Sequence, residues 1–160
     1  MVENDKSENK GAPGENIEPP IDNVIQRSYE ALKDGRLLGF KCKKCNTYGI
    51  LAMGYSCPHC GSFELEELEL SGKGKLHPCS TVVYPMAGVF EEPYIAATVE
   101  LDEGPLITGR LYDLDDFDFD EPKRIFDLIG MDIEIDIRRQ NVLDLEEQYC
   151  VCFVPAKKKK

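Results

Sequence analysis

The stretch CKKCNTYGILAMGYSCPHC, residues 42–60, decides the fold of this chain. It contains two Cys-x-x-Cys pairs separated by eleven residues. Each pair presents two sulfurs to one point, and two pairs can close a tetrahedral site of four thiolates. Soft thiolates favour zinc or iron over hard cations. We therefore predict a structural Zn²⁺ site whose ligands are Cys42, Cys45, Cys57 and Cys60.

Such a closed site leaves no coordination position for water or substrate, so the motif predicts a fold rather than a reaction. Two disulfides or a redox dithiol are competing interpretations. A redox Cys-x-x-Cys normally occurs once, at the start of a helix, so the duplicated pair argues against it. Iron at the same sulfurs would make a rubredoxin-like electron carrier, which a colourless, zinc-containing preparation would exclude.

Charge and length limit the remaining function classes. The chain has 160 residues, and its 30 acidic against 19 basic residues give a net charge of −11. A nucleic-acid partner is disfavoured, because Lys and Arg must replace the counterions of the phosphates. We find no apolar run long enough for a membrane helix or a signal peptide, and we expect a cytoplasmic protein without a membrane partner. A reducing compartment also suits metal-bound thiolates.

The chain divides into segments of different composition. We expect a disordered tail over 1–20, a docking helix over 21–36, a zinc ribbon over 37–68, an OB-fold domain over 69–156 and a basic tail over 157–160. The helix is predicted from apolar residues at three- and four-residue steps between Ile21 and Asp34, with Asp22 as its cap and Gly35 after its end. It either packs on its own domain or docks on a partner.

The fold class is mainly β. Short strands are expected at Leu37–Lys41 and Tyr48–Ala52, and leucines alternate with glutamates over Phe63–Leu70. Gly72 and Gly74 are interpreted as a turn. A five-stranded OB barrel then follows, with strands at Leu76–Tyr84, Tyr94–Leu101, Leu106–Leu111, Met131–Arg138 and Tyr149–Val154 and a short helix at Lys123–Ile129.

Other reactive side chains are few. We interpret Cys79, Cys150 and Cys152 as buried apolar thiols, because none has a base nearby in the sequence. The aspartate-rich run 113–120 lacks the glycine and glutamate of a calcium loop, so a solvated loop anchored by its aromatic residues is expected. With His59 and His77 as the only histidines, the chain is predicted to be non-catalytic by itself.

Lysines surround the first cysteine pair. Lys41, Lys43 and Lys44 would stabilise a zinc–thiolate cluster of formal charge −2. The alternative is a small basic patch that meets a phosphate-bearing ligand.

Four sequence blocks together resemble the acyl-CoA-associated family of zinc-ribbon/OB-fold proteins. The blocks are GRLLGFKCKKC at 35–45, CPHCGS at 57–62, ELSGKGK at 69–75 and AATVELDEGP at 96–105. The resemblance extends from about Ile21 to Pro155. It implies a rubredoxin-like zinc ribbon followed by an OB barrel, and it assigns the metal to the same four cysteines.

The resemblance also implies a role. Members of this family are small subunits that brace a thiolase-fold partner in a hetero-oligomer and help form its acyl-CoA channel, while the catalytic cysteine belongs to the partner. The ligand would be a coenzyme A thioester, with Lys41, Lys43, Lys44, Lys73 and Lys75 as candidates for its phosphates. Members that act on 2-benzoylsuccinyl-CoA in anaerobic toluene breakdown have a similar size and layout. Two alternatives remain: an accessory subunit of an acyl-CoA hydratase, and an OB-fold protein that binds single-stranded nucleic acid.

Overall fold

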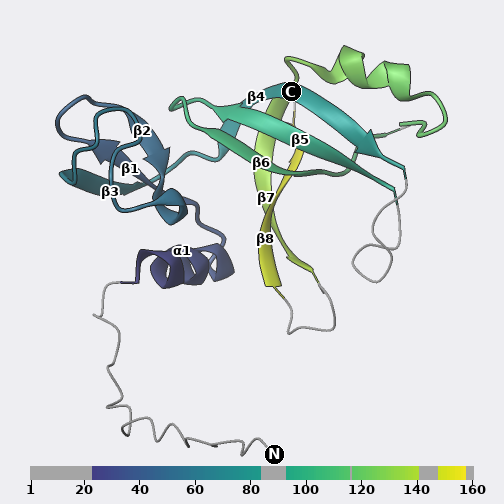
Figure 1. The fold of residues 1–160 in the computed structure, drawn as a ribbon. Coiled ribbons are helices and arrows are strands. Elements are labelled where there is room, and N and C mark those ends of the chain that lie inside the picture. The colour runs from purple at the N-terminus through teal and green to yellow at the C-terminus, as the bar shows by residue number, and fades with distance from the viewer. Residues whose placement is uncertain (1–22, 84–92, 116, 141–147, 158–160) are drawn as a thin grey trace, which may run out of the picture.

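A computed structural model describes residues 23–83, 93–115, 117–140 and 148–157. One α-helix is followed by a three-stranded sheet of order β2-β1-β3 and by a closed barrel of order β4-β5-β6-β8-β7 (Figure 1). This confirms the predicted mainly β class with a ribbon before an OB-type barrel. The tails predicted over 1–20 and 157–160 lie outside the described residues, except for Lys157.

Helix α1 spans Val24–Lys33 and packs on its own chain. The Asn23 side chain accepts hydrogen bonds from the backbone N–H groups of Ile25 and Gln26, so Asn23 provides the cap that we predicted at Asp22. Val24 is buried against the ribbon residues Phe40 and Leu51, whereas the next residue, Ile25, is 60% exposed. One face of the helix therefore packs within the chain, and Ile25 lies on a face that is open to solvent.

The ribbon sheet consists of β1 (Leu38–Cys42), β2 (Tyr48–Ile50) and β3 (Leu65–Glu69). Both neighbours of β1 run antiparallel to it. The strand predicted to reach Ala52 ends at Ile50, because the chain turns into the 3₁₀ helix η1 (Leu51–Met53). Gly49 faces Phe40 across the sheet, where a Cβ would overlap the phenyl ring.

The barrel consists of β4 (Lys73–Val82), β5 (Tyr94–Leu101), β6 (Leu106–Leu111), β7 (Asp132–Gln140) and β8 (Gln148–Pro155). All neighbouring strands are antiparallel except β6 and β8, which are parallel. Its interior contains the side chains of Val99, Ile133 and Phe153, which are almost completely inaccessible to solvent. The short helix predicted before β7 is the 3₁₀ helix η2 (Pro122–Leu128), whose Ile125 joins the core.

The segment Gly72–Lys75 is not the turn that we predicted. β4 already begins at Lys73, and Gly74 pairs with β5 on one side and with β7 on the other. A Cβ at Gly74 would overlap the carbonyl oxygen of Glu100, so the glycine here permits close strand packing rather than chain reversal. Gly72, at φ +68°, provides the left-handed residue just before the strand.

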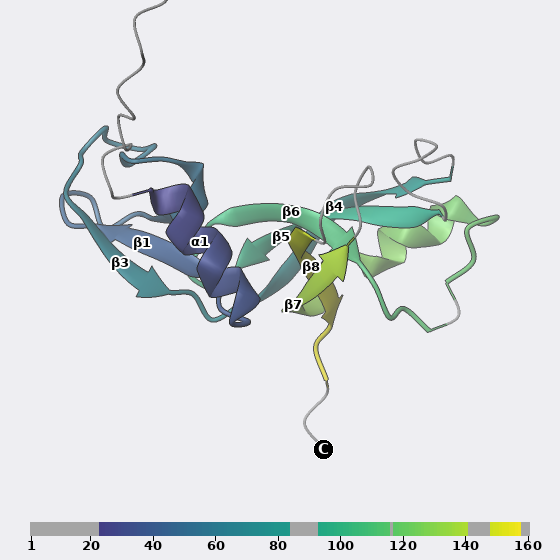
Figure 2. The ribbon, with the colours of Figure 1, turned by 90° about the horizontal axis from the view of Figure 1, so that it is seen from below.

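The ribbon and the barrel share one apolar core. Leu37, Ile50 and Leu70 of the ribbon region belong to the same buried cluster as Leu76 and Leu101 of the barrel. Figures 1 and 2 both place α1 beside the ribbon and next to the β7–β8 hairpin. In the described residues, the helices are too short and too polar to span a bilayer.

Candidate metal centre and its surroundings

Two loops with the same hydrogen-bond pattern present the four cysteines. In the first loop, the N–H of Asn46 donates to the carbonyl of Cys42, and the N–H of Cys42 donates to the carbonyl of Thr47. In the second loop, Gly61 donates to Cys57, and Cys57 donates to Ser62. Each loop thus turns its two sulfurs inward through backbone geometry set by the Cys-x-x-Cys spacing.

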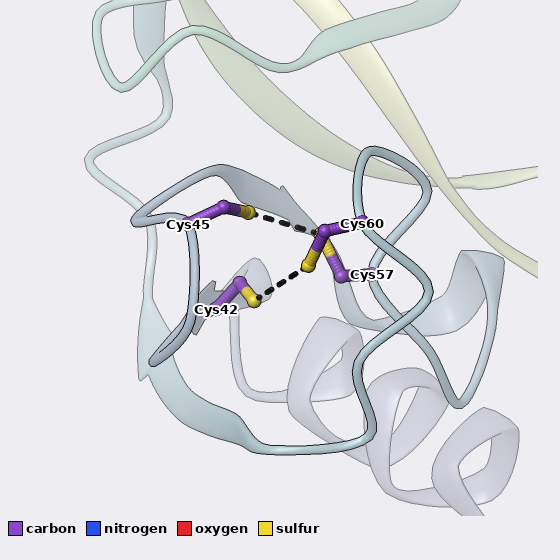
Figure 3. A group of neighbouring side chains, drawn as sticks. All are labelled: Cys42, Cys45, Cys57 and Cys60. Carbon is purple, nitrogen blue, oxygen red and sulfur yellow. Dashed lines mark hydrogen bonds between the residues drawn. The ribbon is translucent and has the colours of Figure 1, made fainter.

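The four sulfurs meet at one point between the loops (Figure 3). The Sγ atoms of Cys42 and Cys60 are 3.6 Å apart, those of Cys45 and Cys57 are 3.5 Å apart, and all four lie within 4.8 Å of one another. A disulfide would require a sulfur–sulfur distance of about 2.05 Å. A tetrahedral zinc ion with bonds of about 2.3 Å gives sulfur–sulfur edges of about 3.8 Å. The arrangement therefore fits a four-thiolate metal site.

The electrostatics of the cluster also favour a cation. Cys42 and Cys57 are buried, and Cys45 and Cys60 are half-buried. The hydroxyl and the backbone N–H of Thr47 lower the pKa of Cys45 to about 5. The backbone N–H of Ser62 favours the Cys60 thiolate, but burial and the other three sulfurs raise the pKa of Cys60 to about 12. Four thiols at one point cannot all ionise without a metal ion, and a divalent cation would remove that conflict.

The residue after each second cysteine is left-handed. Asn46 has φ +59°, and Gly61, at the matching position of the second loop, has φ +70°. Asparagine and glycine adopt this region with the least strain. We expect Asn46→Gly to keep the metal and change the free energy of unfolding by less than about 1 kcal/mol. Asn46→Val should destabilise the chain by about 1–3 kcal/mol, because a β-branched residue is strained there.

Chemical denaturation of the two Asn46 variants, with metal content measured on each, checks this prediction. Equal stability of the valine and glycine variants would contradict the role given to the left-handed turn.

The candidate phosphate-binding lysines divide into two groups. Lys41 lies with Nζ 5.5 Å from the centre of the Tyr48 ring, and Lys43 and Lys44 are exposed on the first loop. Lys73 and Lys75, on β4, form ion pairs with Glu134 and Asp132 of β7. The cysteine-adjacent lysines are therefore the freer candidates, and contact of any of the five with coenzyme A stays a prediction.

The other cysteines only partly match the expectation of buried apolar thiols. Cys152 is buried, but it lies under polar side chains, with Gln140 Nε2 3.4 Å from its sulfur. Burial raises the pKa of Cys152 to about 11. Cys79 and Cys150 are only half-buried, and Cys79 packs against the barrel core. Burial also raises the pKa of Cys79.

The aspartate-rich loop is anchored as predicted. Leu114, Phe117 and Phe119 pack against the barrel core, and the two phenyl rings meet edge to face with centroids 5.1 Å apart. Asp113, at φ +55°, accepts a hydrogen bond of 2.7 Å from Arg138.

Two polar groupings were not found from the sequence. Arg138 of β7 bonds Asp113 and Asp136 and lies over the Tyr112 ring, 4.3 Å from its centre. His77, in the irregular part of the β4–β5 ladder, has Nε2 2.6 Å from a Glu100 carboxylate oxygen on the outer surface. Neither grouping has a local sequence signal, because Arg138 and Asp113 are 25 residues apart in the chain and His77 and Glu100 are 23 residues apart.

A ribbon with a four-cysteine cluster joined to an OB barrel defines the class of protein, and comparisons with known proteins give the family. The family described as the C-terminal OB-fold domain of ChsH2 matches residues 67–138. A DUF35 domain-containing scaffold protein from Methanocaldococcus jannaschii is 36% identical over 121 residues, which cover 74% of this chain and 79% of the relative.

Two further comparisons concern acyl-CoA enzymes and a solved complex. A benzoylsuccinyl-CoA thiolase subunit, BbsA, from Geobacter metallireducens is 32% identical over 109 residues, covering 66% of this chain and 73% of the relative. A chain in the solved structure of the Ltp2-ChsH2(DUF35) aldolase superimposes with a TM-score of 0.62 at 29% identity, covering 86% of this chain and 98% of that one. The chain belongs to the DUF35 family of ChsH2-type OB-fold proteins, which confirms the resemblance drawn from the sequence.

Proposed function

We propose that this chain is a non-catalytic, zinc-binding accessory subunit that docks on a thiolase-fold enzyme and helps shape its acyl-CoA site. The observation that carries the proposal is the similarity to the thiolase subunit BbsA over two thirds of the chain. In the hetero-oligomer it would support thiolytic cleavage of a 3-oxoacyl-CoA, for example 2-benzoylsuccinyl-CoA, with free coenzyme A as the second substrate.

The metal would have a structural role. Cys42, Cys45, Cys57 and Cys60 would hold Zn²⁺ with all four coordination positions filled by the protein. The zinc ion would then cross-link the two loops of a ribbon that has few core residues of its own. The ribbon in turn supports α1 through Val24, Phe40 and Leu51.

Exposed apolar side chains favour a protein partner. Ile25 on α1 is 60% exposed, Tyr55 near the second loop is 60% exposed, and Phe63 is 79% exposed. Exposed large apolar groups on a soluble protein are a common mark of an interaction surface. Leu106 of β6 and Phe126 of η2 are exposed as well, at 53% and 69%, and we expect the docking surface to include the helix and the ribbon.

The proposal is tested by co-expression with a thiolase-fold subunit, followed by size-exclusion chromatography and a thiolysis assay. We expect copurification and turnover of 2-benzoylsuccinyl-CoA or another 3-oxoacyl-CoA only when both chains are present. Each chain assayed separately is the control. A chain that stays monomeric with every thiolase-fold subunit tested would refute this role.

An aldolase-type partner is the second candidate, because the superimposable ChsH2 chain comes from a complex described as an aldolase. The same copurified complex distinguishes the two enzymes. Thiolysis consumes free coenzyme A, whereas retro-aldol cleavage releases a carbonyl compound without consuming it.

A further inference from the structure

The barrel is closed unevenly between β6 and β8. The ladder between these two strands covers only Arg110 with Cys152 and Leu111 with Phe153. In the described ranges, the first part of β6, from Leu106 to Gly109, has no ladder partner on that side. Figure 1 shows β6 running toward the ribbon while the β7–β8 hairpin descends beside α1, so the two strands diverge.

The register shows which backbone groups of β6 face this gap. The N–H of Leu101 donates to the carbonyl of Pro105, so odd-numbered β6 residues form the hydrogen-bonded pairs with β5. On the other side of the strand, the N–H of Tyr112 donates to the carbonyl of Phe153. The even-numbered residues Leu106 and Thr108 therefore direct their N–H and C=O groups into the gap. Each offers one donor and one acceptor, about 6.6 Å apart along the strand.

Helix α1 already occupies the β8 side of the gap. The N–H of Tyr149 in β8 donates to the Tyr29 hydroxyl at 3.3 Å, and the two rings meet edge to face with centroids 6.1 Å apart. On β6, Leu106 is 53% exposed and Thr108 is also exposed, whereas Gly109 already lies against β8, since an added Cβ there would come within 2.6 Å of the Val151 carbonyl oxygen. The gap thus has one covered edge and one accessible edge.

An apolar cavity of about 390 Å³ adjoins the accessible edge. It is lined by side chains from three parts of the chain: Leu32 of α1, Leu37, Leu38 and Ile50 of the ribbon region, and Ile107 and Val151 of the barrel. An unpaired strand edge beside an apolar cavity is the arrangement in which proteins accept an added strand, since the main chain is bonded and alternate side chains are buried.

We propose that an extended, apolar segment of the enzyme subunit adds to the edge of β6 at Leu106 and Thr108 as a further strand and places a side chain in this cavity. The inference rests on the proposed function, because it takes the enzyme subunit as the partner. Charge constrains one end of the segment: the turn before β6 carries the exposed Asp102, so a Lys or Arg is expected at that end. A strand is favoured over a small ligand because the exposed edge repeats its donors and acceptors at strand spacing.

Hydrogen exchange at single amides tests the proposal directly. In the free chain the amide of Thr108 should exchange fast, while those of Ile107 and Gly109, bonded to β5, should exchange slowly. In the copurified complex with the thiolase-fold subunit, the Thr108 amide should become at least about tenfold slower, with little change at its two neighbours. Coenzyme A alone, without the subunit, should leave the Thr108 amide fast.

Substitution of Thr108 provides a second readout. Thr108→Pro removes the N–H that faces the gap and leaves the hydrogen bonds to β5 intact, so it should weaken the complex by about tenfold or more. Thr108→Val keeps the N–H and is the matched control, with affinity expected within about twofold of the original chain. Metal content and melting temperature of the free variants establish whether both have folded. If the proline variant has not folded, the hydrogen exchange of the Thr108 amide in the original chain decides whether a strand is added.

The outcomes separate this inference from the proposed function. A complex that forms with Thr108 still unprotected would overturn the added strand and leave the accessory role intact. Protection of Thr108 by coenzyme A alone would assign the gap to that ligand and would overturn the peptide. Absence of a complex with any thiolase-fold or aldolase subunit would overturn both.

Discussion

Cys57→Ala should release the metal and unfold the ribbon. Cys57 is 1% exposed, and its sulfur lies 3.5 Å from that of Cys45, so no other side chain can take its position without rebuilding the loop. Structural zinc contributes on the order of 10 kcal/mol to the folding of small four-ligand domains. We therefore expect one equivalent of zinc in the original chain and none held tightly by the variant.

Loss of the metal in Cys57→Ala should also weaken assembly with the proposed enzyme subunit. Because the ribbon supports α1 and shares a core with the barrel, its unfolding should weaken the proposed complex with an enzyme subunit, and turnover of that complex should fall as a consequence. Cys150→Ala, which removes a half-buried thiol outside the cluster, is the matched control and should retain the metal. A Cys57→Ala variant that assembles fully but loses turnover would mean that the metal has a catalytic role instead. Metal analysis and copurification measure both effects.

Phe153→Ala should cost about 3–5 kcal/mol of the free energy of unfolding, the usual range for an aromatic residue removed from a core. The Phe153 side chain is completely buried, and its ring lies over Gly109, where an added Cβ would come within 2.9 Å. The backbone of Phe153 also closes the short β6–β8 ladder through the N–H of Tyr112. The substitution therefore removes the packing at the weakest part of the barrel.

Val154→Ala is the matched control for Phe153→Ala, because Val154 is the next residue along β8 and is only half-buried. It should cost less than about 1.5 kcal/mol. Urea denaturation of both variants with metal bound measures the difference. Equal destabilisation by the two substitutions would mean that the barrel interior is not the main source of stability.

Local patterns in the sequence were sufficient for the four-cysteine cluster and for most strands. The Cys-x-x-Cys spacing sets the conformation of each loop by itself, so the meeting of the four sulfurs could be predicted before the fold was known. The predicted strands Tyr94–Leu101 and Leu106–Leu111 coincide with β5 and β6, because apolar and polar residues alternate there with a period of two. Gly35 was correctly placed after the helix, with φ +76°.

The sequence predictions were wrong at residue types that occur in two structural settings, namely glycine and cysteine. Gly72 and Gly74 were taken together as a turn, yet Gly74 lies inside β4, since a glycine that permits close strand contact looks the same in sequence as one that permits a reversal. Cys79 and Cys150 were taken as buried because thiols usually are, but both are only half-buried, and only the tertiary structure decides how far each position on a strand is covered.

The sequence by itself therefore determined the four-cysteine site, the order of the ribbon and the barrel, and the family. All three can be recognised from motifs whose residues lie only a few positions apart in the chain. Only the tertiary structure decided how the barrel closes. The β6–β8 ladder is short, the Tyr29 hydroxyl accepts a hydrogen bond from the N–H of Tyr149 in β8, and, among the described residues, β6 has no ladder partner on the β8 side at Thr108. Tyr29 and Tyr149 are 120 residues apart in the chain, and β6 and β8 become neighbours only through the barrel topology. Contacts of this kind have no local signal, because they exist only after distant strands have been brought together by burial of a shared core.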